Sequence, residues 1–333
     1  MQRLSRLLEG YERLSRVLCR PSRSSGLYIP RVGLVASLFS LLERGVVPLL
    51  YGPRGAGKTT LLRCLALVLP KLGVRCVYAG LHARPPVVLG DVPPQARGLA
   101  EKLGEGRDGA HRGALAAKLA VLLGEGSVLI VDDFDYGLDA EETGRFTRAL
   151  YESLSMTGGH AHVVLATSEA RVALSLHRVL VGNIVPTVFW HMSREEHDSL
   201  ARLLGYRGDL EELYGVTGGS PDALVSIREH GWRLDEWLEY RVRPRVEDAL
   251  SELAALGLSL DTLEPDALGA RRAARYVLLK YNLLTGLRGY ALTRIERGGW
   301  IGSRWAWQLP VYARVVEQSL KTPSEGLLAR RGR

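Results

Sequence analysis

The sequence predicts an α/β protein in which a parallel-sheet domain is followed by a helical subdomain and a basic C-terminal module. Its 333 residues exceed the size at which a single core usually stops growing, about 250 residues. From residue 46 to 191, short apolar runs alternate with helical patterns, which is typical of βαβ units. After His191 helical periodicity replaces the strand-like runs. Two further strand-like runs near the end enclose a Gly-rich turn.

The parallel-sheet domain is expected to contain five strands separated by helices. The expected strands cover residues 46–51, 74–81, 127–131, 162–166 and 184–190. The expected helices cover residues 58–69, 111–124, 139–155 and 169–178. Segment 82–110 holds four prolines and several glycines, so we expect a long irregular insertion there.

The helical subdomain is predicted to begin at Ser193, where Ser193 and Glu196 match a capping box. After a break at 260–267, a further helix is expected over 271–282. Strand-like runs at 289–295 and 303–309, joined by a turn, predict a two-stranded ribbon. A helix followed by a ribbon with a basic, aromatic tip is typical of a winged helix.

The first residues alternate Arg with Leu at helical spacing and predict an amphipathic helix rather than a secretory signal. No apolar run approaches the length of a membrane span, about 20 residues, so we expect a cytoplasmic protein. Cys19, Cys64 and Cys76 lack the CxxC spacing of a zinc site. Cys64 and Cys76 lie in apolar runs, and we expect no disulfide framework.

Charge is unevenly distributed along the chain. Residues 1–31 carry seven Arg against two Glu, and residues 271–333 carry thirteen Lys or Arg against three acids. The total of +8 then leaves a net −7 for the residues between them. Basic ends on an acidic core indicate a polyanionic partner, although solvated basic faces give the same pattern.

The sequence from Gly52 to Thr59 matches GxxxxGK[ST] between an apolar run and a helix, the context that a phosphate-binding P-loop requires. The glycines allow backbone N–H groups to surround a phosphate at a helix N-terminus. Lys58 is expected to contact the β- and γ-phosphates, and the Thr59 hydroxyl to coordinate Mg²⁺. The candidate nucleotide contacts in this loop are Gly52, Pro53, Arg54, Gly55, Ala56, Gly57, Lys58, Thr59 and Thr60.

A second apolar run, Val128 to Val131, ends in Asp132 and Asp133, which has the form of a Walker B motif. Ligands of open α/β sheets bind beyond the carboxyl ends of strands, where these acids are expected to lie. We assign Asp132 to the Mg²⁺ shell and Asp133 to the attacking water. The alternative is that Asp133 or Asp135 caps the following helix.

The run at 162–166 is followed by Thr167 and Ser168, and Arg171 comes shortly after. The two hydroxyls are candidates to sense the γ-phosphate or the water, as sensor 1 residues do, or to cap a helix. Arg171 is a candidate cis arginine for phosphate, and an exposed surface Arg is the equal alternative.

These motifs resemble those of archaeal P-loop ATPases of the STAND and AAA+-related group. The segment Tyr28-Ile29-Pro30-Arg31 looks like the family's segment against adenine, and Pro221, after Gly218-Gly219-Ser220, is similar to the lid proline that approaches the base. The resemblance implies ATP rather than GTP as the nucleotide. It also implies a P-loop NTPase parallel-sheet core, a helical lid and a C-terminal winged-helix domain. The expected boundaries are an N-terminal arm at 1–26, the core at 27–191, the lid at 192–256 and the winged helix at 257–333.

Two functions remain open from the sequence. The first is an ATP-hydrolysing switch whose basic winged helix engages double-stranded DNA; the second is a STAND-type signalling or scaffold ATPase that self-associates or binds a protein partner. Trp305, Trp307 and Leu309 are spaced two residues apart and so share one face of the expected strand. The two tryptophans are expected to pack the ribbon on its core. The candidate nucleic-acid contacts are Arg271, Arg272, Arg275, Lys280, Arg288, Arg294, Arg297, Trp300 and Arg304.

Overall fold

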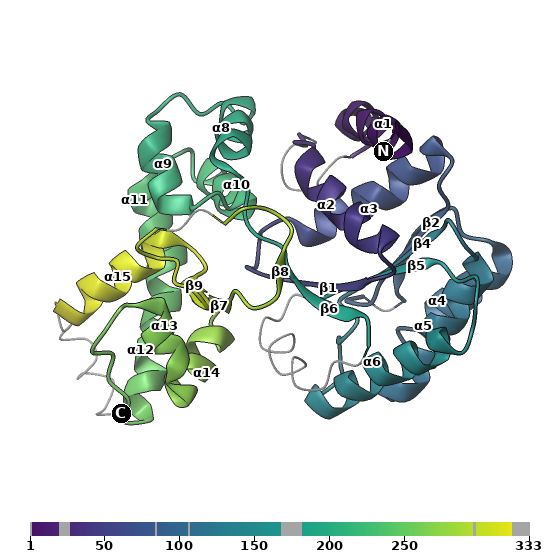
Figure 1. The fold of residues 1–333 in the computed structure, drawn as a ribbon. Helices are drawn as coiled ribbons and strands as arrows, with labels where there is room; N and C mark the ends of the chain where they lie inside the picture. Colours follow the sequence, from purple (N-terminus) through teal and green to yellow (C-terminus); the bar gives the residue numbers. More distant parts are fainter. Residues whose placement is uncertain are drawn as a thin grey trace. The chain divides into compact units, whose positions relative to one another are not determined.

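The computed structural model describes residues 2–19, 27–83, 85–105, 107–167, 182–295 and 298–321. The chain forms two compact units (Figure 1). Unit 1 contains residues Met1–Gly52, Gly57–Trp190 and Arg288–Arg294. Unit 2 contains residues Pro53–Ala56, His191–Leu287 and Ile295–Arg333. Both units therefore include segments that are far apart in the sequence.

The core of unit 1 is a sheet in the strand order β3-β2-β4-β5-β1-β6-β8. Its five central strands are mutually parallel, as the sequence predicts. They are β1 (Val47–Tyr51), β2 (Cys76–Gly80), β4 (Val128–Asp132), β5 (His162–Ala166) and β6 (Ile184–Val188). β1, β2 and β4 are buried along their whole length, which explains their continuous apolar runs. β5 separates β1 from β4, so the P-loop strand and the Walker B strand are not neighbours.

Helices cover both faces of this sheet (Figure 1). One face carries α1 (Gln2–Leu18), α2 (Val32–Glu43), α3 (Lys58–Val68) and the short η1 (Leu69–Leu72). The other carries α4 (Pro94–Lys102), α5 (Gly109–Leu123) and α6 (Ala140–Ser155). The expected helices at 58–69, 111–124 and 139–155 are confirmed as α3, α5 and α6. The one expected at 169–178 lies outside the described residues.

The prediction of an irregular insertion at 82–110 is wrong. The segment contains β3 (Val87–Gly90), which pairs antiparallel with β2, and helix α4. Pro94 does not break α4, because it occupies the first turn, where the missing N–H has no helical partner to lose. Gly90 ends β3 at a φ of 99°, a left-handed conformation that favours glycine. The prolines and glycines therefore punctuate regular elements here.

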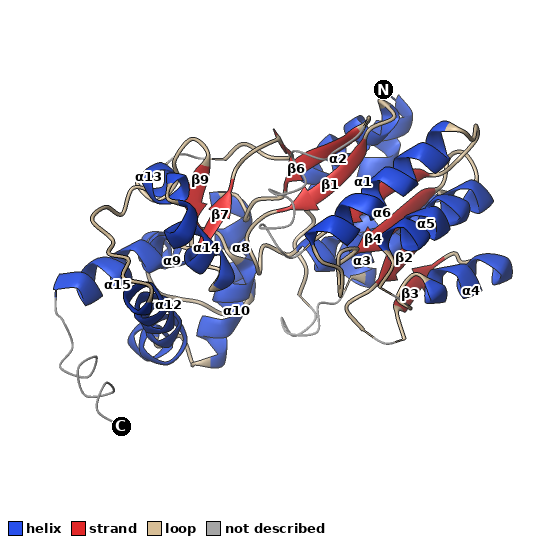
Figure 2. Cartoon of the chain, turned by 90° about the horizontal axis from the view of Figure 1, so that it is seen from below, coloured by secondary structure: helices blue, strands red, loops and turns tan. Residues whose placement is uncertain are grey.

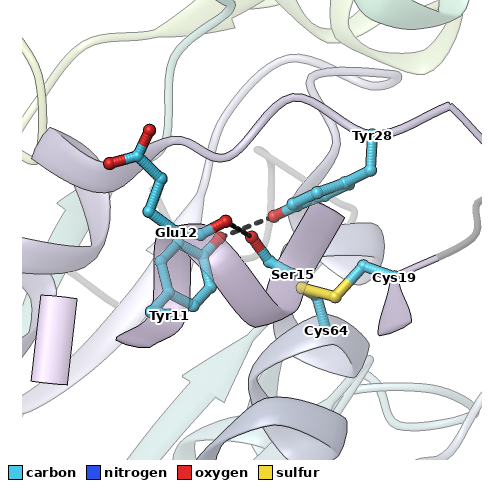
Figure 3. Close-up of a disulfide and its surroundings, with 6 residues drawn as sticks. All are labelled: Tyr11, Glu12, Ser15, Cys19, Tyr28 and Cys64. Atoms are coloured by element: carbon cyan, nitrogen blue, oxygen red, sulfur yellow. Dashed lines mark hydrogen bonds between the residues drawn. A yellow bond between two sulfur atoms is a disulfide. The ribbon is translucent and has the colours of Figure 1, made fainter. Parts of the chain in front are cut away.

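The expectation of no disulfide is also wrong, because Cys19 and Cys64 are bonded, with their Cα atoms 5.2 Å apart (Figure 3). The bond joins the end of α1 to the middle of α3, across 45 residues of sequence. α1 packs closely on this face, since a Cβ at Gly10 would collide with the side chain of Leu72. The spacing of the cysteines in the sequence carries no sign of this packing. Cys76 is free and buried.

Unit 2 consists mainly of helices. They are α8 (Arg194–Leu203), α9 (Leu210–Thr217), α10 (Pro221–Glu229), α11 (Leu234–Trp237), η2 (Leu238–Val242), α12 (Arg243–Ala255), α13 (Pro265–Ala270), α14 (Arg272–Lys280) and α15 (Pro310–Lys321). The predicted capping box is confirmed, with Ser193 and Glu196 bonding reciprocally at the start of α8. The helix expected over 271–282 corresponds to α14. No helix among the described residues is long and apolar enough to cross a membrane.

The predicted ribbon pairs differently from the expectation. β9 (Trp305–Trp307) pairs antiparallel with β7 (Leu284–Gly286), and these two strands form a separate small sheet in unit 2 (Figure 2). β8 (Tyr290–Ala291) instead pairs with β6 in unit 1. Gly289 allows this approach, because a Cβ at its φ of 114° would collide with the Pro186 carbonyl. The expected packing of Trp305, Trp307 and Leu309 is confirmed, since all three are buried.

Candidate functional site

The P-loop runs from the end of β1 into α3, where strand and helix are fixed by their buried apolar residues. Gly52 has a φ of 150°, and a Cβ there would collide with the carbonyl oxygen of Phe189. Gly57, at a φ of 94°, is the N-cap of α3 and has the left-handed conformation that a side chain disfavours. The loop therefore delivers Lys58 and Thr59 at a helix N-terminus, where the helix dipole favours an anion.

Lys58 is 8% exposed, and its Nζ donates to the Gly52 carbonyl oxygen at 3.0 Å. Burial lowers the pKa of Lys58 to about 8, against the opposing effect of the Asp132 and Asp133 carboxylates. A cation held across its own loop is positioned to move onto a phosphate bound by the loop amides.

Asp132, at the end of β4, is 2% exposed and belongs to a network of unit 1. Its Oδ2 accepts a hydrogen bond from the Tyr78 hydroxyl at 2.9 Å, and its carboxylate is hydrogen-bonded to the Thr59 side chain. Burial and then the neighbouring Asp133 raise the pKa of this carboxyl. The structure thus brings together Thr59 and Asp132, the two residues assigned to Mg²⁺. A hydroxyl beside a carboxylate gives the hard oxygen ligands that Mg²⁺ prefers, so these residues fit the ion.

Asp133 follows β4 in a left-handed conformation, with a φ of 51°. A left-handed conformation is uncommon for a residue other than glycine. The Asp133 side chain is 17% exposed, and its Oδ2 lies 3.6 Å from Nδ1 of His82. The helix-capping alternative is wrong for Asp133 and Asp135, because Asp139 caps α6.

Three residues of this network were missed by the sequence analysis. They are Tyr78, which binds Asp132, His82, which faces Asp133, and Arg63, whose guanidinium lies 3.3 Å from the Tyr78 hydroxyl and 3.1 Å from Nε2 of His82. A hydroxyl in the otherwise apolar β2 is the one local signal, because β2 lies beside β4 with Gly80 opposite Asp132.

The candidates after β5 divide between described and undescribed residues. Thr167 is buried at the end of β5, and its Oγ1 donates to Oδ2 of Asp135 at 2.8 Å. Ser168 and Arg171 lie outside the described residues. The assignment of Thr167 and Ser168 as sensors and of Arg171 as a cis arginine stays a prediction.

The candidates for the adenine side have structural partners in unit 1. The Arg31 guanidinium donates to the Trp190 carbonyl oxygen at 3.1 Å and lies 5.1 Å from the centre of the Phe189 ring. The Tyr28 hydroxyl is 2.7 Å from that of Tyr11 in α1 (Figure 3). Arg31 therefore orders the segment after β6, and α1 orders Tyr28. The roles of Tyr28, Ile29 and Arg31 toward adenine stay predictions.

The middle of the P-loop, residues Pro53–Ala56, belongs to unit 2. The Arg54 N–H donates to Oε1 of Gln308 at 3.0 Å, and the Asp222 N–H donates to the Gly55 carbonyl oxygen at 3.3 Å. Pro221 is the first residue of α10, capped by Ser220. No sequence motif marks Gln308, whose side chain accepts a hydrogen bond from a backbone donor of the phosphate-binding loop.

The candidate nucleic-acid contacts are divided between the units. Arg288 and Arg294 flank β8 in unit 1, whereas Arg297 lies outside the described residues. In unit 2, Arg271 is paired with Asp261, Lys280 with Glu252, and Arg275 lies over the Trp305 ring. Trp300 packs near Gly218. Among the candidates in unit 2, Arg272 and Arg304 are exposed and have no ion pair among the described residues.

No protein-family model matches the chain, and no curated protein matches it. Among solved structures, the Walker-type ATPase PABY2304 of Pyrococcus abyssi matches at 16% identity with a TM-score of 0.50, over 91% of this chain and 99% of that one. The Cdc6p of Pyrobaculum aerophilum matches at 14% identity over 90% and 97% of the two chains, with a TM-score of 0.36. The AMPPCP-bound DnaA of Aquifex aeolicus matches at 16% identity over 74% and 78%, also with a TM-score of 0.36.

The first of these likenesses extends over nearly the whole of both chains, and at 16% identity it is a likeness of fold. It agrees with the mostly parallel sheet and with the P-loop between β1 and α3. The predicted fold class is therefore confirmed: the chain has a P-loop NTPase core with a parallel sheet, followed by a mainly helical region.

Proposed function

We propose that this chain is a Mg²⁺-dependent ATPase whose C-terminal region binds double-stranded DNA. The observation that carries the enzymatic part is the contact between Thr59 and Asp132 beside the buried Lys58. A lysine and a hydroxyl at the start of α3, with a carboxylate from the end of β4, are the groups that phosphoryl transfer needs for its phosphates and its metal. The partly exposed Asp133 carboxylate is the group of this network that we assign to the attacking water.

The proposed mechanism assigns a separate task to each group. The P-loop amides bind the β-phosphate, and Lys58 leaves the Gly52 carbonyl to neutralise the β- and γ-phosphates. Thr59 and Asp132 would hold Mg²⁺, which when bound would supply neutralisation of the charge that develops on the phosphate oxygens. Asp133 orients the attacking water and accepts its proton, with His82 beside the same carboxylate.

The choice of ATP over GTP rests on the resemblance of residues 28–31 and of Pro221 to the adenine side of the STAND and AAA+-related ATPases. The sequence contains no NKxD guanine motif. We assign residues 192–256 as the lid and 257–333 as a winged helix, because within 257–333 the helices α13 and α14 are followed by the antiparallel pair β7 and β9. The basic N-terminal arm, residues 1–26, contributes α1 to unit 1.

The exposed Arg272 on α14 and Arg304 before β9 support the DNA-binding part. A second candidate, a scaffold ATPase that binds protein, is favoured by the internal partners of Arg271, Lys280 and Arg275. Those three cations are neutralised or stacked within the chain, which lowers the charge available for a phosphate backbone.

One experiment separates these functions. Release of phosphate from Mg²⁺–ATP is measured for the wild type and for Lys58→Ala, together with the anisotropy of a labelled duplex at two salt concentrations. Hydrolysis lost in Lys58→Ala, with DNA affinity that falls steeply with salt, is the expected result. Hydrolysis without DNA affinity supports the scaffold, and absence of hydrolysis in the wild type overturns the enzymatic proposal.

A further inference from the structure

Arg112, on α5 and outside every motif in the sequence, lies at the back of the turn that follows β4. Its side chain is 2% exposed. The guanidinium donates to the Phe134 carbonyl oxygen at 3.1 Å and to the Tyr136 carbonyl oxygen at 3.0 Å. Hydrogen bonds from a charged donor are about twice as strong as neutral ones, and burial strengthens them further. Arg112 therefore holds the backbone of Phe134 and Tyr136, immediately after Asp133, through two hydrogen bonds.

The same turn is held from the opposite side by β5. The Phe134 N–H donates to the Ala166 carbonyl oxygen at 3.2 Å, and the Thr167 hydroxyl binds the Asp135 carboxylate. Within the turn, the Tyr136 N–H donates to the Asp133 carbonyl oxygen at 2.9 Å. Asp133 itself, at a φ of 51°, occupies a conformation that costs a residue with a Cβ about 1–2 kcal/mol. Such strain persists only where surrounding contacts determine it.

The position of Arg112 is fixed by unusually close packing of α5 on α6. A Cβ at Gly113 would collide with the Phe146 carbonyl, and one at Gly109 with the Glu142 carbonyl. The Gly109 N–H also donates to Oε2 of Glu142 at 2.6 Å. Phe134 packs on Phe146 with ring centres 5.2 Å apart, so the turn also packs on α6. Arg112 thus reaches the turn from a helix that has little freedom to shift.

We propose that Arg112 is a positioning residue for Asp133, acting through the Phe134 and Tyr136 carbonyls to keep the Asp133 carboxylate in place for the attacking water. The inference rests on the proposed ATPase activity and adds to it a group that touches neither nucleotide nor metal. A displacement of about 1 Å at a reacting group can cost about 100-fold in rate. Loss of the two Arg112 hydrogen bonds to the turn should therefore lower kcat and leave nucleotide binding intact, because the P-loop is not part of this contact.

The test compares Arg112→Met, which removes the donors, with Arg112→Lys, which keeps a buried positive charge and one donor group. A matched control is Thr147→Val, at a buried α6 residue whose hydroxyl donates to the Gly144 carbonyl oxygen within its own helix. For each variant we measure kcat and KM for Mg²⁺–ATP, the Kd of a fluorescent ATP analogue, and Tm.

The expected result is a fall in kcat of about 100-fold in Arg112→Met and about tenfold in Arg112→Lys. KM and Kd should stay within about threefold of wild type, and Thr147→Val should keep its kcat even where its Tm falls. If Arg112→Met does not fold, the tenfold loss in Arg112→Lys carries the prediction.

A kcat within about twofold of wild type in the folded Arg112 variants overturns the positioning role, as does an equal loss of kcat in Thr147→Val. A rise in KM with unchanged kcat also overturns it, because that pattern marks lost binding. When the wild type hydrolyses ATP, these outcomes remove only the role of Arg112. A wild type that binds the analogue without hydrolysing ATP removes the proposed activity and this inference together.

Discussion

Charged side chains have different surroundings at the P-loop of unit 1, around Lys58 and Asp132, and on α14 of unit 2 and the residue before it, at Lys280 and Arg271. We call the first group the phosphate edge and the second the basic surface. At the phosphate edge, Lys58 and Asp132 are buried, and each has a partner that fixes its position. On the basic surface, Arg271 and Lys280 are exposed and form ion pairs with Asp261 and Glu252. Burial makes the first set costly to alter and hence informative about chemistry, whereas the second set is screened by water and salt. Net charge alone therefore overstates how much of unit 2 is available to a polyanion.

The largest effect that this comparison predicts is at Lys58. Lys58→Ala should lower kcat/KM for ATP by about 1000-fold, because a cation on the transferred phosphate contributes that much to the rate. Phosphate release and binding of a fluorescent ATP analogue measure the two parts of this loss. Lys71→Ala, at an exposed position of η1 directly after the same helix, is the control that removes a lysine and leaves the phosphate cation in place. Retention of hydrolysis in Lys58→Ala would contradict the role of the buried Lys58 in hydrolysis.

A second prediction concerns how α1 is held on unit 1. Reduction of the Cys19–Cys64 bond should lower the free energy of unfolding by about 2–4 kcal/mol, because the bond closes a long loop in the unfolded chain. Urea unfolding with and without reductant measures the effect. In Cys19→Ala the reductant should have no effect, since the bond cannot form. An equal response of the wild type and Cys19→Ala to reductant would contradict the stabilising role.

A third prediction sharpens the comparison from the side of unit 2, where one acid is used structurally. Asp266 accepts hydrogen bonds from the Ser303 N–H, the Ser303 hydroxyl, and the Arg304 and Trp305 N–H groups, at 2.6–2.9 Å. Partial burial raises the pKa of Asp266, but these hydrogen bonds outweigh it and lower the pKa to about 2. Because the folded pKa is below the unfolded value of about 3.9, the stabilisation is complete above pH 4 and is lost as pH falls toward 2.

Asp266→Asn should therefore lower the free energy of unfolding at pH 7 by about 1–3 kcal/mol, since an amide nitrogen now faces a cluster of donors. Urea unfolding at pH 7 and at pH 3 measures both the loss and its pH dependence. The variant should lose less stability than the wild type between these two pH values. Asp235→Asn, at an exposed position of α11, is the control and should resemble the wild type.

The sequence was sufficient where local pattern and tertiary structure agree. Apolar runs followed by glycine or paired acids predicted β1, β4 and the P-loop, because a buried parallel strand and a phosphate loop each require a short contiguous set of residues. Elements that depend on distant pairings could not be predicted in this way. β8 has two residues and exists through its pairing with β6, and the disulfide depends on how α1 packs on α3. Tyr78, His82 and Arg112 were missed because their roles follow from neighbouring strands and helices rather than from sequence spacing.

The smallest expected effect is on DNA affinity, and it tests whether the candidate DNA contacts Arg272 and Arg304, which have no ion pair among the described residues, differ in function from the paired candidates. Replacing both Arg272 and Arg304 by Ala should reduce the slope of log affinity against log salt by about 1.8, because each phosphate contact contributes about 0.9. Replacing Arg271 and Lys280 should change the slope less, since their ion pairs with Asp261 and Glu252 must break before they can contact DNA. Arg207→Ala, an exposed residue between α8 and α9, controls for charge alone. Equal slopes for the two double variants would show that the internal ion pairs do not limit binding, and the distinction drawn between paired and unpaired cations would then be wrong.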